Sequence, residues 1–322
     1  MPLAKIRSVV QSDIEETDVF IGNELRSEVP LINEMVTHII SCGGKRIRPL
    51  LVLLAARAFD HQQKQHIQLA AAIELIHTAT LLHDDVVDNS TLRRGQETAN
   101  TLWGNKASVL VGDFLYSRAF QLIVKLQNLT ILNIFSNATN LIAEGEVLQL
   151  INCNNPATSE AAYFEVIQRK TGKLFEVAAQ TGAALSNYTA QQMHAMQQYG
   201  MQLGIAYQLI DDALDYKSST AETGKNIGND LAEGKPTLPL IYALQKANPS
   251  EIKLIQNAIQ TSSDKDLNAI LSIIESTGAI EYTANTAKQR IQEANTMLSH
   301  IPDSPYRKSL YELAEFVVER SY

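Results

Sequence analysis

Two clusters of aspartates with the same spacing each follow a strongly apolar stretch of the chain. They are Asp84, Asp85 and Asp88, and Asp211, Asp212 and Asp215. On a helix, the first and the last aspartate of each cluster lie one turn apart on the same side, ~6 Å along the axis. Carboxylates crowded at the end of a buried helix repel one another, so they must be solvated, protonated or neutralised by cations.

The repetition of this pattern helps to choose between two interpretations. A single D-D-x-x-D in an acidic protein is most simply a solvated helix end, whereas two copies that each close an apolar helical run favour a shared function. If the two clusters faced each other across a cavity, they would form an oxygen-lined site for several hard divalent ions. Mg²⁺ is the expected ion, because it takes a few carboxylates, keeps bound waters and bridges to substrate phosphates.

The composition limits the class of protein. The chain has 322 residues, 45% hydrophobic and 6% aromatic, as in ordinary globular proteins. Its formal charge of −8 argues against a nucleic-acid partner.

Cys42 and Cys153 are far apart without a C-x-x-C context, so we interpret them as reduced packing residues. We find no signal-peptide core and no run of ~18 uncharged apolar residues, so we expect a soluble cytoplasmic protein without a membrane span.

Helical periodicity covers most of the chain, and sustained two-residue alternation with hairpin turns is absent. The predicted helices are 5–26, 31–40, 50–59, the stretch from the loop 60–65 to Asp88, 105–126, 128–150, 159–185, 190–216, 237–247, 250–261, 264–276, 279–299 and 304–319. This pattern predicts an all-α fold with one domain over residues 1–322, a single large helical bundle with the two aspartate-bearing helices at its centre. Residues 217–236 contain glycines and polar side chains, and we expect them to form a mobile loop.

Basic side chains accompany the aspartates at several points of the sequence. They are Lys45, Arg48, Arg93, Arg94, Lys170, Lys225 and Lys235. Arginine forks match the geometry of a phosphate, and lysines add positive charge. The chain has neither a G-x-x-x-x-G-K-[ST] loop nor a G-x-G-x-x-G after a strand, so a nucleotide ligand lacks its usual support. Metal and phosphate at one end of a site with apolar walls fit a hydrocarbon diphosphate.

Five motifs follow one another in an order that is typical of a known family. They are Gly43-Gly44-Lys45-Arg46-Ile47-Arg48-Pro49, the first aspartate cluster with Leu92-Arg93-Arg94-Gly95, Lys170-Thr171-Gly172, the stretch from Gln208 to Asp215, and Gly234-Lys235-Pro236-Thr237-Leu238-Pro239. Over residues from about 40 to 245 the chain resembles the trans-isoprenyl diphosphate synthases, and most closely the bacterial octaprenyl diphosphate synthases. One departure is Asn229, where relatives often carry aspartate. The resemblance implies the all-α isoprenoid synthase bundle with a central apolar cavity.

The resemblance also implies a reaction. A Mg²⁺-dependent prenyltransferase would join isopentenyl diphosphate head-to-tail to an allylic diphosphate, with farnesyl diphosphate as the expected primer. The allylic substrate loses its diphosphate, the double bond of isopentenyl diphosphate attacks the resulting allylic cation, and a proton is then lost. Metal ions and basic side chains stabilise the charge that develops on the leaving group.

Matched positions in the family assign the site residues. The expected metal ligands are Asp84, Asp88, Asp211 and Asp215. The expected ligands of the allylic diphosphate are Arg93, Lys170, Thr171, Gln208, Lys225 and Lys235. The expected ligands of isopentenyl diphosphate are Lys45, Arg48, His77 and Arg94. Within these sets, the residues expected to act in catalysis are Asp84, Asp88, Lys170, Asp211 and Lys225.

Several of these side chains also have a simpler interpretation. His77 could be a satisfied core histidine, although it lies two turns before Asp84 on the same helix face. Arg93 and Arg94 could form a solvated charge pair, and Lys225 could serve the solubility of a loop instead of a closing lid.

The remaining polar residues of the motifs are open to the same question. Thr171 and Gln208 could bond only to backbone, and His83 is expected to pack. Asp85 and Asp212 are each rotated ~100° from their neighbours on a helix, so we expect them to support the site or face solvent and not to ligate metal.

Product length is expected to depend on the helix that ends at Asp84. Thr80 lies one turn before Asp84, Ala79 flanks it, and Ile76 continues the row toward the N-terminus. In the family that the chain resembles, synthases of short products carry a bulky aromatic at one of the positions held here by Ala79 and Thr80. Phe135 is the candidate floor of the tunnel, or else an ordinary core residue. We expect a long product, near eight isoprene units.

Three alternatives remain. A shorter-chain farnesyl or geranylgeranyl diphosphate synthase would share the motifs. A class I terpene cyclase usually carries a longer second metal motif and needs no basic cluster at Lys45 and Arg48. A non-catalytic partner subunit of a heteromeric prenyl synthase would be expected to have eroded aspartate motifs, and here both are intact. Relatives are mostly homodimers, so we expect a homodimer, and the pathway to ubiquinone as the destination of the product.

Overall fold

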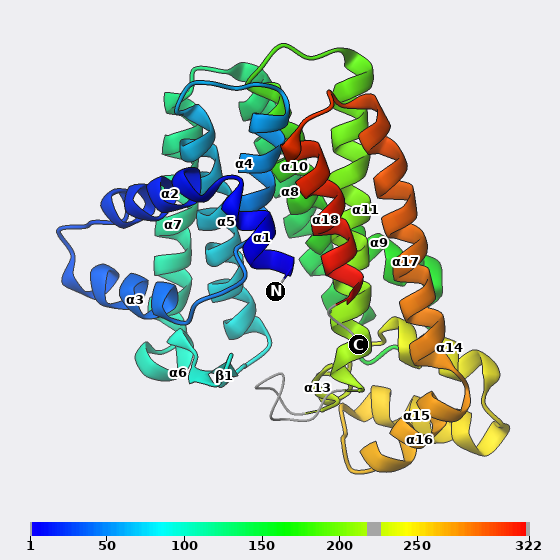
Figure 1. Cartoon of the computed structure of the whole chain (residues 1–322). Coiled ribbons are helices and arrows are strands. Elements are labelled where there is room, and N and C mark those ends of the chain that lie inside the picture. Colours follow the sequence, from blue (N-terminus) through cyan, green and yellow to red (C-terminus); the bar gives the residue numbers. More distant parts are fainter. Residues whose placement is uncertain (1, 218–226, 320–322) are drawn as a thin grey trace. The chain divides into compact units, whose positions relative to one another are not determined.

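The computed structural model describes residues 2–217 and 227–319, and these are almost entirely helical (Figure 1). The helices are α1 (Pro2–Ser8), α2 (Gln11–Glu24), α3 (Pro30–Ser41), α4 (Ile47–Ala58), α5 (Gln65–Val87), α6 (Ala99–Trp103), α7 (Asn105–Lys125), α8 (Leu129–Asn152), α9 (Glu160–Ile167), η1 (Gln168–Gly172), α10 (Lys173–Ala184), α11 (Ala190–Asp215), α13 (Asn229–Ala232), α14 (Leu238–Lys246), α15 (Pro249–Thr261), α16 (Leu267–Ser276), α17 (Ala279–Met297), η2 (Leu298–His300) and α18 (Pro305–Glu319). The predicted all-α class is confirmed.

Two predicted helices are divided, and the short helices α6 and α13 and one hairpin were not predicted. The pattern at 5–26 is broken at residues 9 and 10 between α1 and α2, and the pattern at 159–185 contains the short π-helix η1. The strands β1 (Leu92–Arg93) and β2 (Gln96–Glu97) pair antiparallel as a small hairpin, although the sequence showed no sustained alternation. Strands of two residues are too short to give a periodic signal.

The contacts group the chain into two compact units. Unit 1 is Met1–Asn137, Leu174–Gln198 and Met297–Leu313, and unit 2 is Ala138–Lys173, Tyr199–Thr296 and Ala314–Tyr322. The expectation of one domain over residues 1–322 stays a prediction.

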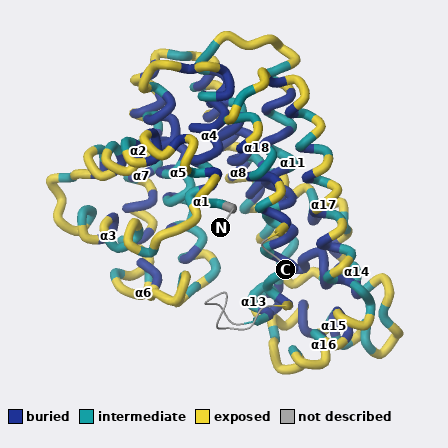
Figure 2. Tube along the Cα trace, in the orientation of Figure 1, coloured by how far each residue is buried: buried dark blue, intermediate teal, exposed yellow. Residues whose placement is uncertain are grey.

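The core of unit 1 is built on α4. Ten of the twelve residues of α4 are buried, because the helix is apolar on nearly every face (Figure 2). It packs against α2 and α5, and α5 packs in turn along α7. Gly182 on α10 allows close approach to α4, since a Cβ there would lie 2.7 Å from the Cβ of Ala55. This packing gives α5 the buried setting that the sequence predicted.

In unit 2, the helices after the second aspartate cluster enclose a separate apolar cluster. Its members are Tyr216 and residues of α13 to α17, among them Leu231, Leu240, Ile255 and Ile270. α15 begins with a capping box in which Asn248 accepts hydrogen bonds from the N–H groups of Ser250 and Glu251. Through Leu231, the short helix α13 packs into this apolar cluster.

One stretch of the described chain, Ala99–Lys125, is long and apolar enough to cross a membrane by length and composition alone. In this structure the stretch forms α6 and α7, and α7 packs along α5. Core helices of globular proteins pass the same test.

A buried ion cluster joins α2 to α4 and α5 within unit 1. Asp13 on α2 accepts hydrogen bonds from Arg57 Nε and Nη2, each at 2.7 Å, and His66 Nε2 lies 3.2 Å from its Oδ1. Burial by itself would raise the pKa of Asp13, but the hydrogen bonds from Arg57 and the close approach of His66 outweigh it and hold the pKa well below its usual value. The cluster therefore stabilises the fold only while Asp13 is ionised.

We predict that Asp13→Asn lowers the free energy of unfolding at neutral pH by about 2–3 kcal/mol, because Arg57 is left partly buried without a counter-charge. A carboxyl with a lowered folded-state pKa contributes stability above its unfolded pKa of ~3.9, and this contribution is lost as the pH falls below that value. Urea unfolding of the wild type and of Asp13→Asn should thus show a difference in the free energy of unfolding that becomes smaller between pH 6.5 and pH 3.

The control is Glu16→Gln, which removes the partner of Lys64 in a solvent-exposed pair and should cost less than ~0.5 kcal/mol. A difference for Asp13→Asn that stayed constant between the two pH values would contradict the role given to its ionised carboxyl.

Candidate functional site

The end of α5 places the first aspartate cluster. Asp88 is the C-cap of the helix. Ser90 N–H donates to Asp85 O at 3.0 Å and Asn89 N–H donates to Val86 O at 3.4 Å, which is the pattern of a Schellman motif. Asn89 has φ of 51°, a left-handed conformation that asparagine tolerates better than most residues. The chain therefore leaves the helix directly after the cluster, and Asp84 and Asp88 stay half-buried in its last turn.

Both clusters lie at the negative end of a helix dipole. Asp84 and Asp88 close α5, and Asp211 and Asp215 close α11, so four half-buried carboxylates add charge where the helix is already negative. Carboxylate oxygens are the donors that Mg²⁺ and Ca²⁺ prefer, so the residues fit a divalent ion. Within residues 2–217 and 227–319, no three acidic, histidine or cysteine side chains alone form a metal-binding group. Water and substrate phosphate would have to complete the coordination.

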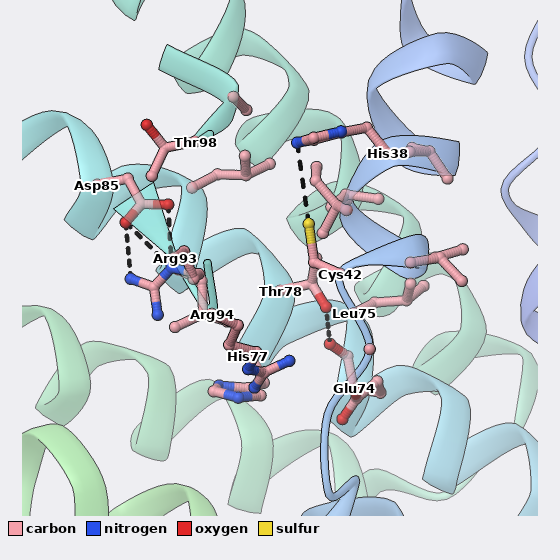
Figure 3. A pocket seen from close by; sticks show the side chains of 18 of the residues that line it. His38, Cys42, Glu74, Leu75, His77, Thr78, Asp85, Arg93, Arg94 and Thr98 are labelled. Atoms are coloured by element: carbon pink, nitrogen blue, oxygen red, sulfur yellow. Dashed lines mark hydrogen bonds and ion pairs between the residues drawn. The ribbon is translucent and has the colours of Figure 1, made fainter. Parts of the chain in front are cut away.

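Asp85 turns away from the helix face that Asp84 and Asp88 share. It is buried, and it forms a two-pronged ion pair with Arg93 on β1 (Figure 3). Arg93 Nη2 lies 2.7 Å from Asp85 Oδ1, and Nε lies 3.1 Å from both carboxylate oxygens. Burial by itself lowers the pKa of Arg93, but Asp85 and the nearby aspartates raise it above its usual value. The pair thus holds a charged guanidinium beside the cluster.

The hairpin turn positions Arg94. Arg94 and Gly95 have φ values of 54° and 77°, as the two central residues of a type I′ turn require. The Arg94 guanidinium lies against Gly44, where a Cβ would be 2.7 Å from Arg94 Nη1. A side chain at position 44 would therefore clash with the Arg94 guanidinium. Two sequence motifs that are 50 residues apart are in contact here.

Arg48 and His77 also meet. Arg48 Nη1 lies 3.1 Å from His77 Nε2, and the Arg48 guanidinium stacks over the Phe175 ring, 4.5 Å from its centroid. Arginine has only donors, so His77 Nε2 accepts and the ring proton is on Nδ1. Burial, followed by the charges of Arg48 and the hairpin arginines, lowers the pKa of His77 well below its usual value. His77 is therefore a neutral donor through Nδ1. Lys45, just before α4, is exposed.

A cavity of about 70 Å³ lies in unit 1 beside the hairpin arginines (Figure 3). Its lining includes His77, Arg93 and Arg94, together with apolar side chains of α3 and α5. Glu74 also lines it, and its Oε2 is buried with no hydrogen-bond partner among the described residues. Burial raises the pKa of Glu74, and the nearby arginines oppose that shift. The sequence interpretation missed Glu74, although it is the only carboxylate between residues 61 and 83.

The residues expected to set product length belong to the core of unit 1. Ile76, Ala79 and Phe135 are almost completely buried, and Thr80 is half-buried with its hydroxyl donating to His77 O at 2.8 Å. Among the described residues, these four are not part of the lining of the 70 Å³ cavity. Their effect on product length stays a prediction.

In unit 2, the end of α11 carries the second cluster. Asp212 is buried and accepts hydrogen bonds from Tyr163 of α9 and from Gln208. Thr171 of η1 donates to Gln208 Oε1 at 2.8 Å, so these two side chains bond to each other and not only to backbone. Asp215 Oδ2 accepts from the Asp230 N–H at 3.0 Å, which ties the cluster to the first turn of α13.

The π-helix η1 carries Lys170 next to Thr171. Lys170 Nζ lies 2.5 Å from Glu146 Oε2 on α8, and η1 approaches α8 closely at Gly145, where a Cβ would lie 2.8 Å from Lys170 N. Short π segments inside helices are frequent at functional sites. Glu146 was also missed, because a partner on a distant helix leaves no signal in the sequence near Lys170.

Three further predicted residues have different outcomes. Lys235 follows α13, and its Nζ lies 2.5 Å from Glu233 Oε2. Lys225 lies outside the described residues, whereas residues 227–236 of the expected loop are described and include the short helix α13. His83 packs against α7, where its Nε2 is 3.2 Å from Val109 O.

Comparison with known proteins gives consistent matches over the whole chain. A sequence model of the polyprenyl synthetase family matches residues 29–276. The chain is 46% identical to an octaprenyl diphosphate synthase of Haemophilus influenzae over 100% of this chain and 98% of the relative. It is 43% identical to an all-trans-nonaprenyl-diphosphate synthase (geranyl-diphosphate specific) of Rhodobacter capsulatus, over 98% of this chain and 97% of that protein.

A solved structure is also very similar. The polyprenyl synthase from Caulobacter crescentus, complexed with calcium and isoprenyl diphosphate, superposes with a TM-score of 0.96. The two chains are 40% identical, and the match covers 99% of this chain and 98% of that one.

We predict that Asp85→Asn lowers the free energy of unfolding by about 2 kcal/mol, because it removes the counter-charge of the largely buried Arg93 guanidinium. Hydrogen exchange at the Thr98 amide, which bonds to Thr91 O across the hairpin, should accelerate. Urea unfolding and amide exchange measure the two effects.

The matched control is Asp303→Asn, which breaks the pair between Arg307 and an aspartate whose side chain is 89% exposed. It should cost less than ~0.5 kcal/mol. Equal costs for the two variants would mean that the Asp85 pair does not hold the hairpin.

Proposed function

This chain belongs to the polyprenyl synthetase family, and we propose that it makes octaprenyl diphosphate. It is a prenyltransferase, a long-chain trans-polyprenyl diphosphate synthase of a family that uses a divalent metal and joins isopentenyl diphosphate to an allylic diphosphate. In this proposal the ion is Mg²⁺, the primer is farnesyl diphosphate, and the enzyme is a cytoplasmic homodimer that serves ubiquinone synthesis. The supporting observation is the 46% identity to an octaprenyl diphosphate synthase over the full chain.

The two aspartate clusters and their basic neighbours divide the work of binding. Asp84, Asp88, Asp211 and Asp215 would hold the ions. When bound, the ions neutralise the charge that develops on the departing diphosphate. Lys170 and Arg93 add fixed positive charge for the same group, and each is kept in place by a carboxylate, Glu146 and Asp85 respectively.

The second substrate would bind through a different set of groups. Arg48, Arg94 and Lys45 offer guanidinium and ammonium donors, and His77 offers its Nδ1–H. Because His77 is neutral, it offers a directional hydrogen bond without adding positive charge to a site that already contains several basic side chains. The function of these groups is to hold the diphosphate of isopentenyl diphosphate so that its double bond points at the allylic carbon.

The proposal predicts the outcome of one incubation. With isopentenyl diphosphate, farnesyl diphosphate and Mg²⁺, the protein should form octaprenyl diphosphate, and EDTA should abolish the reaction. Asp84→Ala should lower kcat by a factor on the order of 10²–10³, because an ion that stabilises the leaving group loses a ligand. Chromatography of the dephosphorylated products measures length and rate together.

The control is Asp113→Ala, which removes a carboxylate of α7 whose side chain is 63% exposed, and which should keep the wild-type rate. Activity that survives EDTA or Asp84→Ala would rule out the metal-dependent mechanism. A product of four units or fewer from the unmodified protein would favour the shorter-chain alternative.

Product length gives a second prediction. Ala79→Tyr should shorten the product to three or four units, because a phenol ring beside Thr80 would block the path along α5. Phe135→Ala should lengthen it. Product chromatography makes the measurement, and Ala79→Ser, which keeps the side chain small, is the control. If Ala79→Tyr still made the wild-type product, the growing chain would not run along this helix.

A further inference from the structure

A chain of hydrogen bonds in unit 2 joins α9, η1 and α11. Tyr163 Oη donates to Asp212 Oδ2 at 2.5 Å, and Gln208 Nε2 donates to Asp212 Oδ1 at 2.7 Å. Thr171 Oγ1 donates to Gln208 Oε1 at 2.8 Å. Tyr163, Asp212 and Thr171 are buried, so these bonds are made where water offers little competition. Two of the four residues, Thr171 and Gln208, are expected to bind the allylic diphosphate, whereas Tyr163 has no role yet.

Asp212 fixes the direction of every bond in this chain. Gln208 Nε2 donates to Asp212 Oδ1 and Gln208 Oε1 accepts from the Thr171 hydroxyl, so the amide turns its NH₂ group toward Asp212 and its carbonyl oxygen toward Thr171. The Thr171 hydroxyl then donates to that carbonyl. If the Gln208 amide were reversed, its oxygen would face a carboxylate oxygen and its NH₂ would face the hydroxyl, and the bond to Asp212 would be lost.

Tyr163 holds Asp212 in the orientation that this arrangement needs. Its hydroxyl occupies Oδ2, which leaves Oδ1 directed at Gln208, one turn earlier on α11. Burial raises the pKa of Tyr163 well above its usual value, so the phenol keeps its proton and remains a donor. Without the hydroxyl, a buried carboxylate oxygen would lose its donor, a costly state that favours rotation of the Asp212 side chain.

The orientation of the Gln208 amide matters because a diphosphate only accepts hydrogen bonds. An amide NH₂ has two N–H donors, and Asp212 uses one of them, so the second can point at the ligand. The reversed amide would present its carbonyl oxygen to the anion. The direction of one side-chain amide therefore decides between attraction and repulsion.

We propose that Tyr163 is a positioning residue for the allylic diphosphate, because through Asp212 it keeps an N–H of Gln208, and not its carbonyl oxygen, directed at the ligand. The inference rests on the proposed function for the identity of that ligand. In this proposal Tyr163 acts through Asp212 and Gln208 and not by contact with the diphosphate.

The test is Tyr163→Phe, which removes one oxygen atom and leaves the buried ring in place. The KM for farnesyl diphosphate should rise roughly tenfold, the effect of weakening one hydrogen bond to a charged group. The KM for isopentenyl diphosphate should stay within twofold. Calorimetry with farnesyl diphosphate and Mg²⁺, in the absence of the second substrate, should show the same tenfold loss of affinity without any turnover.

The matched control is Tyr282→Phe. The Tyr282 hydroxyl donates to Glu160 Oε1 at 2.9 Å, so it also bonds a carboxylate and also contacts α9, but it has no link to Gln208. A general loosening of α9 would affect both variants, whereas the positioning role predicts wild-type KM values for Tyr282→Phe.

A double-mutant cycle decides whether the effect passes through Gln208. In a Gln208→Ala background, Tyr163→Phe should have no further effect on the affinity for farnesyl diphosphate, since the amide it orients is gone. Additive effects, equal effects on both substrates, or an unchanged affinity in Tyr163→Phe would each overturn the proposal.

The same measurements separate this inference from the proposed function. If the wild type binds farnesyl diphosphate but does not elongate it, the proposed function fails, and the calorimetry still decides the role of Tyr163. If the wild type does not bind farnesyl diphosphate at all, both fail.

Discussion

Negative charge concentrated at the carboxyl ends of two apolar helices is the constraint on which the rest of this structure depends. Asp84 and Asp88 close α5, and Asp211 and Asp215 close α11, where the helix dipole already disfavours anions. Such a placement favours cations close by, and in unit 1 Arg93 lies beside the cluster. The same imbalance makes the site ready for divalent ions that arrive with an anionic substrate.

The middle aspartate of each cluster has a different task from its neighbours. Asp85 is buried against Arg93, and Asp212 is buried against Tyr163 and Gln208. In both cases the middle aspartate points ~100° away from the preceding aspartate around the helix axis, so its side chain packs against other residues of the same unit. One carboxylate of each cluster thus anchors a neighbouring element, the hairpin in unit 1 and α9 in unit 2, while the others remain at the helix end.

Sequence patterns predicted the helices well, because long apolar periodicity reports burial directly. The pattern also predicted that Asp85 and Asp212 would turn away from their neighbours, since that follows from helix geometry alone. It could not predict Glu146 or Tyr163, whose partners come from distant parts of the chain, or Glu74, which lines a cavity formed by several helices. The hairpin at 92–97 was missed because its strands have two residues each and its turn places an arginine where asparagine or glycine is usual.

That arginine shows how function can oppose stability at a single position. Arg94 has φ of 54°, a conformation that costs a residue with a side chain ~1 kcal/mol or more relative to glycine. Selection for thermal stability alone would therefore replace Arg94 by glycine or asparagine and would remove the guanidinium that lies against Gly44. The strain is thus a cost in stability at a residue that is expected to bind isopentenyl diphosphate. Libraries designed to stabilise this chain should accordingly keep position 94 fixed.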